Sequence, residues 1–122
     1  MLNEYKAHVE ERATQNIPPL PLDADQTSQL VELLKADNEE SELLLYLLKE
    51  RVPAGVDQSA YVKAAFLADI TTGKTSSPYI TKSDAVEILG TMLGGYNIQP
   101  LIECLKDNEL AEAAAHVLSR TL

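Results

Sequence analysis

The 122-residue chain contains only one cysteine, Cys104. A single thiol excludes an internal disulfide and is typical of a reducing compartment. Residues 1–6 also lack the basic segment and the following apolar segment that begin a secretory signal. These absences predict a cytoplasmic protein.

Long apolar runs and positive charge are scarce as well. No uncharged apolar stretch approaches the roughly 20 residues that span a bilayer, so the sequence predicts no membrane segment. Lys and Arg number 10 against 19 Asp and Glu, which gives a formal net charge of −9. This charge repels phosphate backbones. Nucleic-acid binding is therefore not expected of this chain by itself.

Helical periodicity is the main signal that is present. Apolar residues make up 45% of the chain and recur at helical spacing in about seven segments, without a convincing strand. The apolar members of these segments span residues 2–13, 30–34, 43–48, 61–70, 85–93, 101–105 and 110–121. The length suits one compact domain, residues 1–122. We therefore expect a single all-α domain.

The third segment, residues 43–48, reads Leu-Leu-Leu-Tyr-Leu-Leu, a run that periodicity alone could also assign to a buried strand. Glutamates precede the run and Lys49 and Arg51 follow it, an order that suits a helix macrodipole. Leucine also favours helix. Because the run is apolar nearly all round, we expect it to pack on more than one side, with Leu45 in the core. Leu67 of the next segment is expected there too.

Helix boundaries are marked by capping residues. Asp23 or Asp25 can cap the second helix, and Asp57 can cap the fourth. Thr81 and Asp84 resemble a capping box at the start of the fifth helix, with aspartate in place of the usual glutamate. Prolines at positions 18, 19 and 21 predict an extended linker after the first helix.

The sequence Gly94-Gly95-Tyr96-Asn97 joins the fifth and sixth segments. A helix C-cap often needs a residue at positive φ, so we expect a positive φ at Gly95, or at Gly94 if the helix ends one residue earlier. Asn97 is expected to cap the next helix, with Pro100 in its first turn. A corner between helices is exposed, so Tyr96 and Asn97 are also the candidate partner-contact residues. Capping and packing are the alternative roles for both.

No group of residues predicts a catalytic, metal or cofactor site. Gly73-Lys74-Thr75 ends like a phosphate-binding loop, but the first glycine of that motif would fall at Ala68, inside a predicted helix. His8 and His116 lie near opposite ends of the chain, each among charged residues at four-residue spacing, which is typical of exposed helix faces. Cys104 lies on an apolar face and is expected to be buried and unreactive.

The last two segments form a predicted helical hairpin that resembles a HEAT repeat. Pro100 enters its first helix, an aspartate lies in the turn, and an Ala-Ala pair lies in the second helix, although the usual Val-Arg pair is absent. A similar pair is expected from residues 43–48 and the helix after Asp57, where Val62-Lys63 stands in for Val-Arg. Stacked pairs bury a continuous core and present broad faces to a partner.

Longer stretches carry a closer resemblance. The segments "MLNEYKAHVEERA", "PLDADQTSQLVELLK", "RVPAGVDQSAYVKAAFLADI" and "LGTMLGGYNIQPLIECL" are similar to the N-terminal HEAT-like domain of the bacterial aconitase B family. The similarity runs from residue 1 to residue 122 and covers only that domain. It implies an α-solenoid, a HEAT-like stack of about seven antiparallel helices, without the catalytic aconitase domains.

The resemblance implies a family of lyases that interconvert citrate and isocitrate, and often act on 2-methylisocitrate, with an iron–sulfur cluster held by cysteines of a distant domain. None of the family's catalytic or cluster-binding motifs falls on a residue of this chain. For this domain the resemblance implies docking on the catalytic domains or self-association, and a role in shaping access to the active site. The chain alone is therefore expected to be non-catalytic and free of cofactor.

An independent helical-repeat adaptor or scaffold related to that domain is the alternative function. Residues 119–122 end without a glycine or proline signal, as if a helix had been cut, so the sequence favours a piece of a longer chain over an independent product.

Overall fold

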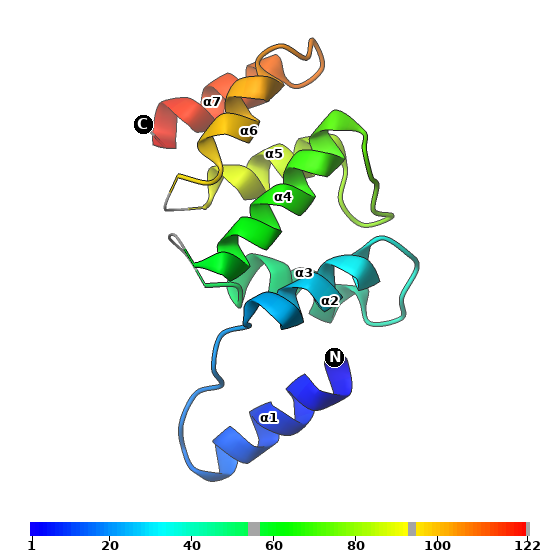
Figure 1. Ribbon diagram of the computed structural model, residues 1–122, viewed down its shortest axis with the longest axis vertical. Coiled ribbons are helices and arrows are strands. Elements are labelled where there is room, and N and C mark those ends of the chain that lie inside the picture. The colour runs from blue at the N-terminus through cyan, green and yellow to red at the C-terminus, as the bar shows by residue number, and fades with distance from the viewer. Residues whose placement is uncertain (54–56, 93–94, 122) are drawn as a thin grey trace.

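The computed structural model describes residues 1–53, 57–92 and 95–121. These residues contain seven α-helices and no strand, so the predicted all-α fold is confirmed. The helices are α1 (Leu2–Thr14), α2 (Ala24–Leu34), α3 (Ser41–Glu50), α4 (Gln58–Thr72), α5 (Lys82–Gly90), α6 (Ile98–Cys104) and α7 (Ala111–Thr121). Figure 1 shows an elongated stack with α1 at one end and α6 and α7 at the other.

The helices stack in pairs. Helix α2 packs on α3, α4 on α5 and α6 on α7, while α2 also contacts α4 and α5 also contacts α7. The predicted final hairpin is therefore confirmed. The predicted pairing of α3 with α4 is wrong, because α3 pairs with α2 and α4 pairs with α5. Helices α2 and α3 each bury one stripe of leucines, and packing on each other covers both stripes.

One apolar core runs through the stack. It contains side chains from all seven helices, and those exposed by less than 2% include Leu30, Leu34, Leu44, Leu47, Leu48, Leu67, Leu89, Leu101, Leu110 and Val117. Leu67 is thus in the core as predicted. Burial of each such side chain stabilises the fold by roughly 1.5–3 kcal/mol.

Helix α3 is amphipathic, although its sequence is apolar nearly all round. Leu44, Leu47 and Leu48 are buried, Leu45 is half-buried, and Tyr46 is 50% exposed. The expectation that α3 packs on more than one side stays a prediction, because Tyr46 is exposed while the five leucines around it are buried or half-buried. A leucine run by itself does not reveal how many neighbours a helix has.

The predicted helix starts are confirmed by their hydrogen bonds. The Asp23 carboxylate accepts a bond from the Gln26 N–H at 2.8 Å, and the Gln26 side chain accepts one from the Asp23 N–H. Thr81 and Asp84 form the same reciprocal pair at the start of α5. Asp57 caps α4 by accepting from the Ser59 N–H at 2.9 Å. Each cap stabilises its helix by about 1 kcal/mol.

Helices α5 and α7 approach each other closely at Gly90. A Cβ atom added at Gly90 would lie 2.8 Å from the Cβ of Val117. Only glycine fits at this crossing without a shift of the backbone. None of the helices in the described ranges is long and apolar enough to cross a membrane.

Candidate protein-contact site

The corner between α5 and α6 is built differently from the prediction. Gly95 has a φ of 95°, so the predicted positive φ is confirmed. Helix α5 nevertheless ends at Gly90 with Thr91 as its C-cap in a right-handed conformation, so the C-cap role of Gly95 is wrong. Gly94 lies outside the described residues. The Gly95 carbonyl accepts a bond from the Ile98 N–H, which turns the chain into α6.

Asn97 is the N-cap residue of α6 by position, but its side chain bonds to the end of α5. Its Nδ2 donates to the carbonyls of Leu89, at 2.7 Å, and Met92, at 3.2 Å, and no side-chain cap bond to α6 is formed. The predicted N-cap position is therefore confirmed, but the side chain does not form a capping bond. The side-chain amide of asparagine can donate hydrogen bonds as well as accept them. The sequence therefore did not reveal whether it would bond to the end of α5 or to the start of α6. Pro100 lies in the first turn of α6, as predicted.

The side chain of Asn97 is 0% exposed. A fully buried side chain cannot touch a partner without a change in the fold. Of the two predicted partner-contact residues, the structure leaves only Tyr96 on the surface, where it is half-buried.

Tyr96 packs edge to face against Tyr61, with ring centroids 5.5 Å apart and an angle of 77° between the planes. Tyr61 belongs to the first turns of α4 and is 51% exposed. The sequence pattern counted Tyr61 only as the first apolar member of this helix and did not indicate its exposure. The pair joins α4 to the α5–α6 corner and places two aromatic rings at the surface.

Two further exposed apolar side chains belong to α6 and to the residue that follows it. Figure 1 shows α2, α4 and α6 together on the near side, with α3, α5 and α7 behind them. Ile102 of α6 and Leu105, just after it, are both exposed. We refer to Tyr61 of α4, Tyr96 of the α5–α6 corner, Ile102 of α6 and the following Leu105 together as the contact face.

A groove of about 250 Å³ between α2 and α4 continues the contact face from Tyr61. Val31, Val62, Ala65 and Phe66 are among its apolar lining residues, and Glu32, Lys35 and Asp69 add charge. Lys35 forms an ion pair with Glu32 at 2.9 Å, on the same helix. This arrangement, an apolar strip with a charged border, is typical of surfaces that bind other proteins.

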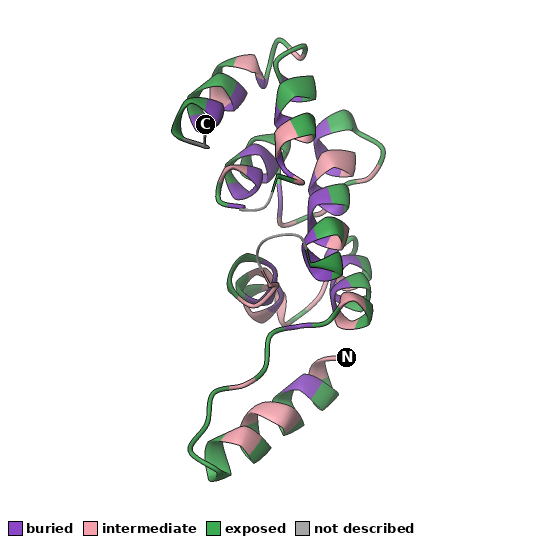
Figure 2. Cartoon of the chain, turned by 60° about the vertical axis from the view of Figure 1, so that its left-hand side comes forward, coloured by how far each residue is buried: buried purple, intermediate pink, exposed green. Residues whose placement is uncertain are grey.

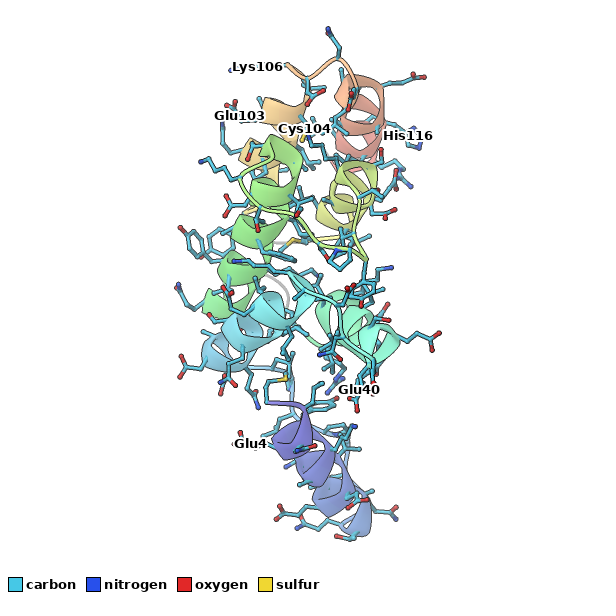
Figure 3. All side chains as sticks on the ribbon, turned by 90° about the vertical axis from the view of Figure 1, so that its right-hand side faces the viewer. Glu4, Glu40, Glu103, Cys104, Lys106 and His116 are labelled. Carbon is cyan, nitrogen blue, oxygen red and sulfur yellow. The ribbon has the colours of Figure 1, made fainter. Side chains whose placement is uncertain are left out.

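Cys104 does not fit the role of a metal-cluster ligand. Its side chain is buried, as predicted, and burial raises the pKa of the thiol, although a hydrogen bond with Thr71 acts in the opposite direction. Cluster ligands are thiolates, and several are needed, whereas the sequence has one cysteine. Figure 3 shows Cys104 on α6 near Glu103 and Lys106, which form an ion pair at 3.6 Å.

The two histidines differ. His116 is exposed on α7, as predicted, and Figure 3 shows it on the outer side of that helix. His8 is half-buried, and its Nε2 accepts a hydrogen bond from the Leu20 N–H at 2.9 Å. The predicted surface position of His8 is therefore only partly met, because the linker after α1 bonds to the ring and leaves it half-exposed.

Gly73 ends α4 with a φ of 81°, and the N–H groups of Lys74 and Thr75 donate to the Asp69 carbonyl. These bonds account for Gly73-Lys74-Thr75 as a helix terminus. The sequence favoured an ordinary loop over a phosphate-binding site at these residues, and this geometry agrees with that interpretation.

Sequence reasoning missed the burial of Lys63. This side chain of α4 is 5% exposed, and burial lowers the pKa of its ammonium to about 8, with Glu50 of α3 acting in the opposite direction. The apolar residues on both sides of position 63 were the sign of this burial that the sequence offers. Lysine side chains are usually exposed, however, so the sign was not read that way.

Replacement of Gly95 by alanine is expected to destabilise the fold by about 1 kcal/mol, because the left-handed conformation is strained for a residue with a Cβ. No atom lies within 4 Å of the added Cβ, so crowding contributes nothing. Urea unfolding measures the change. Gly95→Asn is the matched control and should cost less, since asparagine tolerates this conformation; equal losses in the two variants would contradict the strain argument.

Comparison with known proteins gives the family. The model of the aconitate B N-terminal domain matches residues 4–122. The chain is 58% identical over 123 residues to aconitate hydratase B of Escherichia coli, covering 100% of this chain and 14% of that protein. The sequence identity is 54% to the Synechocystis protein of the same name and 45% to the Helicobacter pylori protein of that name. The chain spans 14% of the length of these relatives and belongs to the aconitate B N-terminal domain family.

Proposed function

We propose that this chain is a non-catalytic protein-contact domain of a cytoplasmic aconitate hydratase B. It binds the remaining domains of that enzyme, or a second copy of itself, and shapes access to the active site. The observation that carries this proposal is the contact face, in which Tyr61 packs against the half-buried Tyr96, and Tyr61, Ile102 and Leu105 are exposed.

The chemistry of the described residues supports a contact role over a catalytic one. The single cysteine is buried with a raised thiol pKa, and the two histidines are more than a hundred positions apart in sequence, on the first and last helices. Aromatic residues are enriched at the centres of protein interfaces because they bury a large area at low entropic cost. Hydratase activity and the iron–sulfur cluster then belong to parts of the enzyme outside this chain.

The proposal is tested by mixing the chain with the remaining part of Escherichia coli aconitate hydratase B, at about 50 μM, in sedimentation velocity. We expect a complex, or self-association of the chain. Tyr96→Ala should weaken the association about tenfold, because it removes one ring of the exposed pair.

Tyr46→Ala is the matched control. Tyr46 is exposed to the same extent as Tyr61 but lies on α3, behind the contact face. It should leave the association unchanged. A chain that neither binds the remaining enzyme nor self-associates would contradict the proposal and favour the independent adaptor; equal losses in the two tyrosine variants would contradict only the choice of face.

A further inference from the structure

Three of the six prolines in the sequence lie between α1 and α2, in the run Ile17-Pro18-Pro19-Leu20-Pro21-Leu22. We call residues 17–22 the proline run. A proline ring fixes φ at about −65°, and a residue followed by proline is restricted to extended conformations. The covalent structure of the run therefore favours a polyproline II helix. Figures 1 and 2 show an extended segment here, and Figure 2 colours it mostly as exposed.

Burial along the proline run follows the period of a polyproline II helix. This helix has about three residues per turn, so residues three positions apart lie on one ridge. Leu22 is 1% exposed, and Pro19, three positions earlier, is half-buried. The ridge formed by Pro19 and Leu22 therefore faces the protein.

The other two ridges of the proline run face solvent. Ile17 and Leu20 form one of them and are 37% and 54% exposed. Leu20 has the most exposed large apolar side chain among the described residues. Pro18 and Pro21 form the other ridge and are both exposed. The proline run thus presents two adjacent apolar ridges at the surface.

Both ends of the proline run are fixed. Helix α1 contacts the stack through the buried Tyr5 and through an ion pair between Lys6 and Glu40 at 2.6 Å. At the end of α1, the Ile17 N–H donates to the Arg12 carbonyl at 3.1 Å. At the other end, α2 begins with its capping box. The proline run is therefore held between two bonded helix termini.

Hydrogen bonds also hold the backbone in the middle of the proline run. Arg51 Nη2 donates to the Pro19 carbonyl at 2.6 Å, and the Leu22 N–H donates to the Arg51 carbonyl at 2.9 Å. The Leu20 N–H donates to His8 Nε2 at 2.9 Å. These bonds use backbone atoms of the run and leave its two exposed ridges uncovered. A segment that is already ordered loses little conformational entropy when it binds.

The proline run is uncharged, although the chain carries a net charge of −9. Residues 13–22 contain no Asp, Glu, Lys, Arg or His. A surface that is complementary to this run is therefore apolar. Extended proline-rich segments bind in grooves lined by aromatic side chains, because the preformed helix presents its rings and apolar side chains at low entropic cost.

We propose that the proline run is a preformed polyproline II ligand for the aromatic-lined groove of a separate protein. The run shares no residue with the contact face, to which the proposed function assigns the remaining enzyme. The inference therefore goes beyond the proposed function and adds a second surface with a different kind of partner.

Titration of the 15N-labelled chain with an isolated WW domain, an SH3 domain and an EVH1 domain tests the proposal, because each carries an aromatic-lined groove for proline-rich segments. We expect at least one of them to bind with a Kd below about 500 μM and to shift chiefly the amide signals of residues 15–23. Absence of shifts with all three domains at about 1 mM would overturn the proposal.

Two variants locate the binding surface. Pro18→Ala and Leu20→Ala each remove one member of an exposed ridge and should weaken the binding about tenfold. Ile102→Ala is the matched control, because Ile102 is also an exposed aliphatic side chain but lies on the contact face. It should leave the binding unchanged. Equal Kd values for Leu20→Ala and the wild type, or equal losses in Leu20→Ala and Ile102→Ala, would overturn the proposal.

Sedimentation velocity with the remaining part of Escherichia coli aconitate hydratase B separates this inference from the proposed function. Leu20→Ala should keep that association, whereas Ile102→Ala should weaken it. A loss of that association in Leu20→Ala would mean that the proline run binds the enzyme itself, and would overturn the assignment to a separate protein. Shifts of residues 15–23 on dilution of the chain alone would indicate a second copy and would overturn it too. If the domains bind the proline run while the remaining enzyme does not associate, only the proposed function fails.

Discussion

Leu67→Asp should abolish the cooperative unfolding transition of this domain. Leu67 is 0% exposed at the middle of α4, the helix that contacts both the α2–α3 pair and α5. An unpaired buried carboxylate costs several kcal/mol, and the loss of the leucine adds about 2–5 kcal/mol. Together these approach the 5–15 kcal/mol by which a domain is stable. Far-ultraviolet circular dichroism during urea unfolding measures the effect.

Leu45→Asp is the control for this experiment, since Leu45 is only half-buried on α3. There the carboxylate can reach water, and the loss of stability should be much smaller. Equal losses of stability in Leu67→Asp and Leu45→Asp would mean that Leu67 is not in the buried core.

Lys63→Met should stabilise the domain at pH 7 by about 1–3 kcal/mol. The folded-state pKa of Lys63, about 8, lies below the ordinary value of 10.5, chiefly because burial disfavours the charged ammonium. Below pH 8 the lysine is protonated in both states, so the folded state bears the full cost. Between pH 8 and 10.5 the folded state releases its proton first, and the contribution of Lys63 to stability improves as pH rises.

The stabilisation by Lys63→Met should therefore be largest at pH 7 and should shrink toward pH 10, as measured by urea unfolding at both values. Comparison of variant and wild type at each pH cancels the titration of other groups. Lys49→Met, at an exposed lysine of α3, is the matched control and should change little. A gain from Lys63→Met that does not depend on pH would indicate improved packing alone and contradict the charge argument.

Local signals in the sequence predicted the helix starts well. Asp23, Asp57 and the pair of Thr81 and Asp84 cap the predicted helices because a capping bond joins residues two or three positions apart. The positive φ of Gly95 was predictable for a related reason, since few residues other than glycine adopt it without strain. These features depend on neighbouring residues and need no tertiary partner.

The candidate site was predicted only in part. The surface position of Tyr96 was anticipated, whereas its partner Tyr61 and the burial of Asn97 were not. Tyr61 is 35 positions from Tyr96, and the Asn97 amide bonds to the end of the preceding helix. Both contacts arise from the way α4, α5 and α6 meet, which the spacing within one helix does not specify.

By itself, the sequence determined that this chain is all-α and belongs to the aconitate B N-terminal domain family, because helical periodicity, capping residues and overall similarity are properties of the sequence. Only the tertiary structure decided that α3 pairs with α2, that Lys63 is buried, and that Tyr5 and the Lys6–Glu40 ion pair are among the contacts of α1 with the stack. The physical reason is that burial and pairing depend on which apolar stripes face each other in space, and several pairings of the same amphipathic helices satisfy the same sequence pattern.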